Sequence, residues 1–295
     1  MKKLIERLLI FFLGIPAVVA LVLFAGFHNN LALNLIITIL SGVGAVEFSS
    51  MLEKKQIRIS KIKSFILGAV APLAVTLNIS FCLPAWIIPV VIMSGIGWVI
   101  LSAIFTKTSE IESVIFNVIG SFSLIIYPGS FMYWFVKMNV WNNNYVILLF
   151  LFIIFASDSI AWLFGSLFGG NNRGVISVSP NKSIAGFAGG IIGPLLISFI
   201  AVFTVFPDNI KLFPALTFCA APFSKMLLVA FLLGFFTGFA AIMGDLAESA
   251  VKRSCDFKDS GKFMLGRGGA LDSIDSIAVA APVFYLLYHH LFIIH

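Results

Sequence analysis

The chain has 295 residues, of which 60% are hydrophobic and only 11% charged, and its mean hydropathy is +1.07. This composition excludes the one or two ordinary soluble domains that the length alone would permit. We attribute the formal net charge of +6 to basic loops beside anionic lipid, and we expect no nucleic-acid partner.

Apolar runs of about 18 residues or more recur along the chain and indicate transmembrane helices. They lack the alternation that strands of a membrane barrel require. We therefore predict an all-α, polytopic membrane bundle of about nine helices that lies in the bilayer as a multi-pass protein. The predicted spans are residues 8–27, 31–52, 64–80, 84–105, 113–136, 145–168, 183–206, 224–243 and 271–293.

The basic residues predict the orientation of these helices. With the N-terminus placed in the cytoplasm, the inward segments hold all but three of the 19 Lys and Arg residues. The outward loops keep Lys137, Lys211 and Lys225. This asymmetry is the one that the positive-inside rule describes. The segment that follows the sixth span and the segment that precedes the ninth are then both cytoplasmic.

Two acidic residues fall within predicted spans, where an unpaired charge is costly. Glu47 lies near the cytoplasmic end of the second span, and either pairs there with Lys54 or Lys55 or belongs to a site. Asp158 lies deeper, in the sixth span. We expect Asp158 to face the interior of the bundle or a water-filled cavity, and to form or support a functional site.

The loop after the sixth span has the sequence GGNNRGVISVSPNKSIAGFAGG. Its Gly, Asn and Ser-Pro residues indicate irregular turns, and Lys182 comes at the start of the seventh span. A serine, a lysine and the free N–H groups of a helix start are suited to phosphate, although a plain basic loop has the same composition. The glycines of the seventh and eighth spans are explained by close helix packing.

The most polar stretch of the chain, residues 244–276, lies between two apolar spans. It holds six carboxylates, five basic residues and a cluster of glycines. We expect the eighth span to continue as a helix to about Arg253, which places Asp245, Glu248, Ser249 and Lys252 on one helix face.

The glycines of this stretch let the chain fold back towards the start of the ninth span, where Asp272 and Asp275 share a face. Carboxylates from two helices, completed by phosphate oxygens, are a usual arrangement for Mg²⁺. Four basic residues would neutralise a triphosphate and a departing pyrophosphate. They are Lys252, Arg253, Lys258 and Arg267.

The stretch also resembles the signature of the phosphatidate cytidylyltransferase (CDP-diacylglycerol synthase) family. That pattern runs Ser, two positions, Lys-Arg, four positions, Lys-Asp-x-Gly, then a His-Gly-Gly turn and Asp-Arg-x-Asp. The residues in register are Ser249, Lys252, Arg253, Lys258, Asp259, Gly261, Gly268, Gly269, Asp272 and Asp275.

The resemblance extends upstream and is strong over about residues 155–282. Asp158 begins an element similar to Asp-x-x-Ala-Tyr-x-x-Gly, Ser179 to Ser183 resemble Ser-Pro-x-Lys-Thr, and Glu47 suits an early acidic position. The chain departs from the pattern at four positions. Arg267 replaces the histidine of the turn, Ser273 replaces an arginine, Leu265 a proline and Ala185 a glutamate.

The resemblance implies transfer of the cytidylyl group from CTP to phosphatidic acid, giving CDP-diacylglycerol and pyrophosphate with Mg²⁺ as cofactor. It implies an N-terminal transmembrane region at 1–140 and a catalytic region at 141–295. It also implies the cytoplasmic (inner) membrane, a cytoplasmic active site and a homodimer. The expected metal ligands are Asp245, Asp272 and Asp275. The expected catalytic residues are Lys252, Arg253, Lys258, Asp259 and Arg267, and the expected substrate-binding residues are Asp158, Ser179, Lys182, Ser249, Gly268 and Gly269.

Three other functions remain open from the sequence. One is a CTP-dependent kinase of a lipid alcohol, and another is a cytidylyltransferase that acts on an ether lipid. The third is a transporter in which Glu47 and Asp158 lie on an ion path, although most ionisable residues fall at one membrane surface. We further hypothesise that Arg267 supplies the cation that Ser273 lacks.

Overall fold

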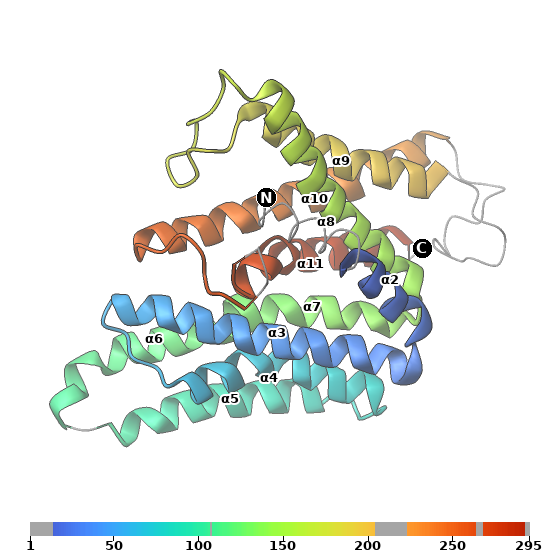
Figure 1. Cartoon of the computed structure of the whole chain (residues 1–295). Helices are drawn as coiled ribbons and strands as arrows, with labels where there is room; N and C mark the ends of the chain where they lie inside the picture. The colour runs from blue at the N-terminus through green and yellow to red at the C-terminus, as the bar shows by residue number, and fades with distance from the viewer. Residues whose placement is uncertain (1–13, 107, 204–222, 264–267, 293–295) are drawn as a thin grey trace. The chain divides into compact units, whose positions relative to one another are not determined.

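The structure is a computed structural model that describes residues 14–106, 108–203, 223–263 and 268–292. These residues form helices and no β-strand, apart from an isolated bridge between Arg173 and Ser183 (Figure 1). They divide into two compact units. The first unit comprises 1–140 together with 251–274, and the second comprises 141–250 together with 275–295.

In the first unit, α4 (Lys61–Ser80) contacts most of the other helices. Its neighbours are α3 (Phe27–Lys54), α5 (Ile87–Ile104), the π-helical turn η3 (Ile125–Ser130) and α7 (Phe131–Lys137). A short helix, α2 (Ile15–Phe24), precedes α3.

The close approach of α3 and α4 depends on small residues. A Cβ at Gly68 of α4 would collide with Ala45 of α3. Ser41 Oγ of α3 lies 2.7 Å from the carbonyl oxygen of Gly68 and 2.9 Å from that of Pro128 in η3. These contacts fix α3, which carries Glu47, against its neighbours.

The helical stretch from Thr108 to Trp141 is built from five consecutive pieces. Pro128, which has no N–H to donate, lies within its π-helical turn, where the regular ladder of α-helical hydrogen bonds is interrupted. The pieces are η2 (Thr108–Ser113), α6 (Val114–Leu124), η3, α7 and η4 (Met138–Trp141).

A chain of buried amides joins the start of α3 to η4 within the first unit. Asn30 Nδ2 donates to Asn139 Oδ1 at 2.9 Å, and Asn139 Nδ2 donates to Asn34 Oδ1 at 2.8 Å. All three side chains are buried. Since an amide in an apolar interior is costly without partners, this network ties the two segments together.

The second unit is built from α8 (Asn144–Phe168), α9 (Ile184–Phe203) and most of α10 (Phe223–Ser254) and α11 (Leu271–Phe292). Glycines allow these helices to approach closely, as expected. A Cβ at Gly193 of α9 would meet the carbonyl oxygen of Ala156 in α8, and one at Gly238 of α10 would meet the Pro194 ring of α9. Ser157 Oγ of α8 also donates to the Gly190 carbonyl of α9, at 2.8 Å.

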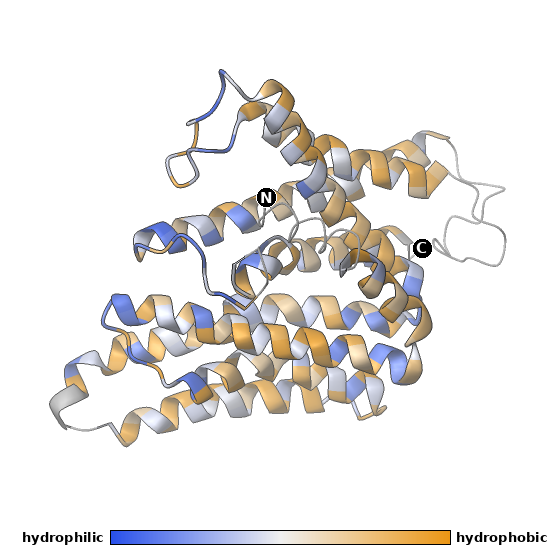
Figure 2. Ribbon diagram, in the orientation of Figure 1, coloured by the Kyte–Doolittle hydropathy of each residue, from blue (hydrophilic) through white to orange (hydrophobic). Residues whose placement is uncertain are grey.

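The helical fold and the predicted spans are confirmed in the described residues. Eight helical stretches are long and apolar enough to cross a bilayer, and their bounds follow the second to ninth predicted spans within a few residues, except that the stretch for the eighth span, Phe223–Ser254, extends well beyond residue 243. Of the first predicted span, 8–27, only the part from residue 14 is described, and it contains α2. Figure 2 shows that the helices are apolar along most of their length.

The structure confirms that the eighth span continues as a helix. α10 runs without interruption for 32 residues to Ser254, or about 48 Å, whereas the hydrocarbon core of a bilayer is about 30 Å thick. The segment 251–274, which follows most of the C-terminal region in sequence, belongs to the same compact unit as residues 1–140. The polar stretch 244–276 is therefore shared between the two units.

Candidate active site

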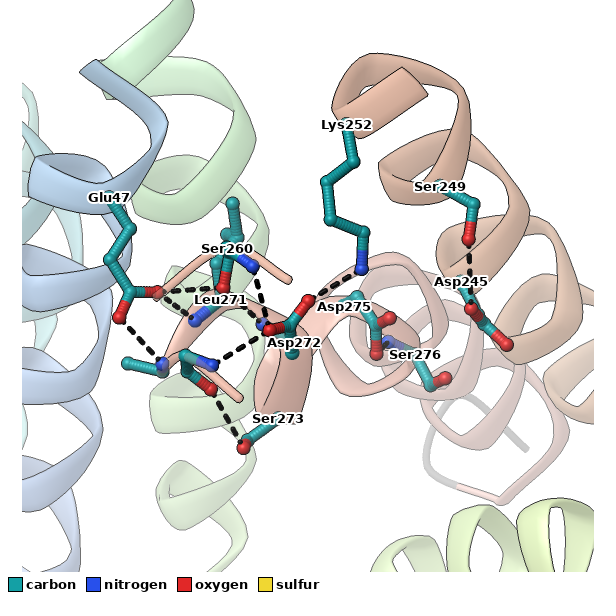
Figure 3. A network of polar contacts seen from close by, with 12 residues as sticks. Glu47, Asp245, Ser249, Lys252, Ser260, Leu271, Asp272, Ser273, Asp275 and Ser276 are labelled. Atoms are coloured by element: carbon teal, nitrogen blue, oxygen red, sulfur yellow. Dashed lines mark hydrogen bonds and ion pairs between the residues drawn. The ribbon is translucent and has the colours of Figure 1, made fainter. Parts of the chain in front are cut away.

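The first unit contains a polar cluster around the start of α11. The carboxylate of Glu47, from α3, accepts hydrogen bonds from Ala270 N at 3.0 Å and from Leu271 N at 2.9 Å (Figure 3). It also accepts one from Ser260 Oγ at 2.9 Å. Glu47 thus points towards Ser260, Ala270 and Leu271. The alternative in which it turns to Lys54 or Lys55 at the interface is wrong.

Asp272 receives hydrogen bonds from the same turn. Its Oδ2 accepts from Gly269 N at 2.7 Å and from Ser260 N at 2.8 Å, while its own N–H donates to Ser260 Oγ at 3.2 Å. The carboxylate lies at the N-terminus of α11, where the helix dipole favours negative charge. The Asp272 side chain is only 8% exposed. These contacts hold the carboxylate in one orientation.

Two glycines are required by the path of this turn. Gly268 has a φ of +99°, a conformation that other residues rarely adopt, and a Cβ there would meet Asp272 Oδ2. A Cβ at Gly269 would meet Ser260 Oγ and Glu47 Oε2. The glycine cluster therefore lets backbone N–H groups come within hydrogen-bond distance of two carboxylates.

Lys252, near the end of α10, supplies a cation to this cluster. Its Nζ donates to Asp272 Oδ1 at 2.5 Å, and the lysine side chain is only 12% exposed. Both predicted residues are thus brought together in the first unit. The neighbouring Arg253, Lys258 and Asp259 are exposed, and Arg267 lies outside the described residues.

The second unit contains a separate polar cluster on α10. Lys182 Nζ forms an ion pair with Asp245 Oδ2, and Ser249 Oγ lies 3.4 Å from Asp245 Oδ1. Asp245 and Ser249 are one helical turn apart, as predicted from their spacing. The two side chains of the ion pair remain about one third exposed, at 28% for Lys182 and 34% for Asp245.

The loop before α9 explains the position of Lys182. Successive turns link Ser179 N to the Ile176 carbonyl at 3.1 Å and Lys182 N to the Ser179 carbonyl at 3.0 Å. Ser183 then caps α9, because its Oγ accepts from Gly186 N at 3.0 Å. Lys182 is therefore fixed immediately before the helix, as the sequence predicted.

Asp275 of α11 lies within electrostatic reach of three other carboxylates of the second unit. Asp275 is 8% exposed, Glu248 is fully buried, and the charges of Asp245, Glu248 and Asp158 all act on Asp275. α10 and α11 approach closely here, since a Cβ at Gly244 would meet the Asp275 carbonyl oxygen. Asp275 Oδ1 accepts from Ser276 N at 2.5 Å.

The predicted metal ligands belong to different units, with Asp272 in the first and Asp245 and Asp275 in the second. Among the residues that the structure describes, no three His, Cys, Asp or Glu side chains come close enough to hold a metal ion together. The assignment of these three aspartates to a metal stays a prediction. Glu47 and Ser260 were missing from the predicted site residues, and the early acidic position of Glu47 was the one signal that pointed to either.

The fold and these clusters define a multi-pass membrane protein with a lysine-paired aspartate in each unit, Asp272 beside the glycine turn and Asp245 on α10. This class is suited to the chemistry of phosphates. The model of the cytidylyltransferase family matches residues 5–291, so the chain belongs to that family. It is a nucleotidyltransferase by this membership.

The chain is similar to several curated proteins. It is 29% identical over 277 residues to the phosphatidate cytidylyltransferase of Chlamydia pneumoniae, covering 88% of this chain and 82% of that protein. It is 33% identical over 177 residues to the phosphatidate cytidylyltransferase of Bacillus subtilis, covering 58% and 59%. It is 34% identical over 140 residues to the uncharacterized protein YnbB of Escherichia coli, covering 48% and 41%. The last two matches thus span only about half of each relative's length.

Proposed function

We propose that this chain is a phosphatidate cytidylyltransferase, which makes CDP-diacylglycerol and pyrophosphate from CTP and phosphatidic acid. The proposal rests on the family membership and the names of the relatives. The observation that supports it in this chain is the pairing of Lys252 with Asp272 beside the glycine turn. A lysine can bind a phosphate, and a carboxylate beside it can bind the cation that accompanies the phosphate.

In the proposed reaction, a phosphate oxygen of phosphatidic acid attacks the α-phosphorus of CTP. The bond between the α-phosphorus and the bridging oxygen breaks, and pyrophosphate leaves with the electron pair. No covalent intermediate on the protein is needed. Positioning and charge stabilisation then supply most of the rate, through Lys252 and Lys182 and the exposed Arg253 and Lys258.

Mg²⁺ is part of the proposal, and the chemistry of the aspartate side chains supports it. Asp245 and Asp272 offer carboxylate oxygens, which Mg²⁺ prefers, and each is now paired with a lysine that marks a place for positive charge. Asp275 is the third proposed ligand. When bound, Mg²⁺ would neutralise the phosphates of CTP.

We also propose that the protein lies in the cytoplasmic membrane with its active site towards the cytoplasm, where CTP is present. The excess of Lys and Arg in the inward segments supports this orientation. The family resemblance supports a homodimer. Cysteine accessibility labelling of the loops in intact cells tests the orientation, and light scattering of the detergent-solubilised protein tests the dimer.

An assay with two labelled forms of CTP tests the reaction. Purified protein receives CTP labelled at either the α- or the γ-phosphorus, together with phosphatidic acid and Mg²⁺. The proposed reaction puts only the α-label into lipid and loses it when phosphatidic acid is omitted or EDTA is added. Transfer of the γ-label to a lipid alcohol would instead identify a kinase. No labelled lipid with any acceptor, an ether lipid included, would contradict a nucleotidyltransferase.

A further inference from the structure

Four successive backbone N–H groups lead into α11, and each of them has a side-chain acceptor. Such groups at a helix start have no partner within the helix. Gly269 N donates to Asp272, and Asp272 N donates to Ser260. The two N–H groups between them, of Ala270 and Leu271, both donate to Glu47, which is more than 220 residues away in sequence.

Glu47 uses both oxygens of its carboxylate in this contact. Oε1 accepts from Ala270 N, while Oε2 accepts from Leu271 N and from the hydroxyl of Ser260. Ser260 in turn accepts from Asp272 N and donates its own N–H to Asp272 Oδ2. Glu47, Ser260 and Asp272 therefore form one connected network on a single turn (Figure 3).

Two glycines beside the Glu47 carboxylate leave room for it because they have no side chain. A Cβ at Gly261 would meet Glu47 Oε1, and a Cβ at Gly269 would meet Glu47 Oε2. A plain helix cap needs no such clearance on both sides. The turn before α11 thus packs closely around a carboxylate that belongs to another helix, α3.

We propose that Glu47 is a positioning residue of the active site. Its carboxylate closes the turn at the start of α11 and so fixes the orientation of Asp272 towards Lys252. Glu47 acts through Ser260 and the backbone of 269–271 and needs no contact with substrate. The catalytic consequence rests on the proposed function, whereas the capping of the turn does not.

The variant Glu47→Gln tests this role with little change of volume. Whichever way the amide is turned, its NH₂ group faces an N–H that has lost its acceptor. We expect amide hydrogen exchange in peptides covering 268–274 to accelerate at least about tenfold, because the turn opens more often. We expect kcat to fall by about 10- to 100-fold, the usual effect of a residue that orients a site, with the KM for CTP changed less than about threefold.

Two further variants separate positioning from a general loss of stability. Glu53→Gln makes the same substitution at an exposed position on the same helix, and should leave exchange and kcat unchanged. Ser260→Ala removes only one hydroxyl from the network and should act in the same direction as Glu47→Gln. The double variant should lose little more activity than the worse single variant, because both act on one turn.

The outcomes are distinct. If Glu47→Gln leaves both exchange and kcat at wild-type values, or speeds exchange without lowering kcat, Glu47 does not position Asp272 and the proposal is wrong. Independent, multiplicative losses in the double variant would contradict it as well. If the wild-type protein transfers no cytidylyl group, the proposed function fails, and the exchange measurement still decides whether Glu47 holds the turn.

Discussion

Lys252 Nζ lies 2.5 Å from Asp272 Oδ1, and the two side chains are only 12% and 8% exposed. The pair joins the end of α10 to the start of α11 within the first unit. A charge so withdrawn from solvent is costly when its partner is removed, even where the pair itself adds little to stability. Lys252 and Asp272 should therefore respond to substitution in both stability and activity.

Replacing Lys252 by Met leaves the Asp272 carboxylate without this cation. We expect unfolding to become easier by about 3–5 kcal/mol and cytidylyl transfer to fall at least about tenfold. Thermal unfolding in detergent and the α-labelled CTP assay measure the two effects. Lys61→Met, at an exposed position of α4, is the matched control and should change neither. Wild-type activity in Lys252→Met would remove Lys252 from the proposed catalytic residues.

The positive charge of Lys182 and the negative charge of Asp245 can be exchanged between the two positions. Lys182→Asp and Asp245→Lys should each lower the melting temperature, and the double reversal should recover part of it, because opposite charges again face each other. Turnover should stay at least about 100-fold below wild type in the double variant, since a lysine cannot ligate Mg²⁺. Recovery of turnover together with stability would show that the pair is purely structural.

Replacing glycine by alanine should have opposite effects on stability at Gly269 and at Gly97. Gly269→Ala would push a Cβ against Ser260 Oγ and Glu47 Oε2, so we expect it to abolish most activity and to lower the melting temperature. Gly97→Ala, within α5, meets no atom within 4 Å and should stabilise the helix by about 0.5–1 kcal/mol. Equal melting temperatures for the two variants would contradict the tight packing at Gly269.

The buried amide network should affect stability without affecting catalysis. Asn139→Leu removes the partner that joins Asn30 to Asn34, at a cost of about 1–3 kcal/mol. Asn30 and Glu47 are 17 residues apart on α3, or about 25 Å, so turnover per folded molecule should be unchanged. The exposed Asn171→Ala is the control for the melting temperature. A large loss of turnover in Asn139→Leu would show that the two ends of α3 are coupled.

The sequence by itself determined the helices and the family. Long apolar runs have few alternatives to membrane helices, because every backbone polar group in lipid needs a partner within the protein. The fixed spacing between Ser249, Lys252 and Asp272 carried the resemblance to the family. It also allowed the prediction that α10 continues beyond its apolar part, because helical spacing places Asp245 and Ser249 on one face.

Only the tertiary structure decided which partner each carboxylate has. The sequence allowed Glu47 either to pair with Lys54 or Lys55 or to belong to a site, and its contact with Ala270 and Leu271 excluded the pairing. The division of residues 244–276 between two compact units was equally invisible in the hydropathy pattern. The physical reason is that the spacing of apolar and charged residues in the sequence reflects neighbours along one helix. A hydrogen bond between distant segments instead depends on the fold bringing a donor and an acceptor within about 3 Å of each other.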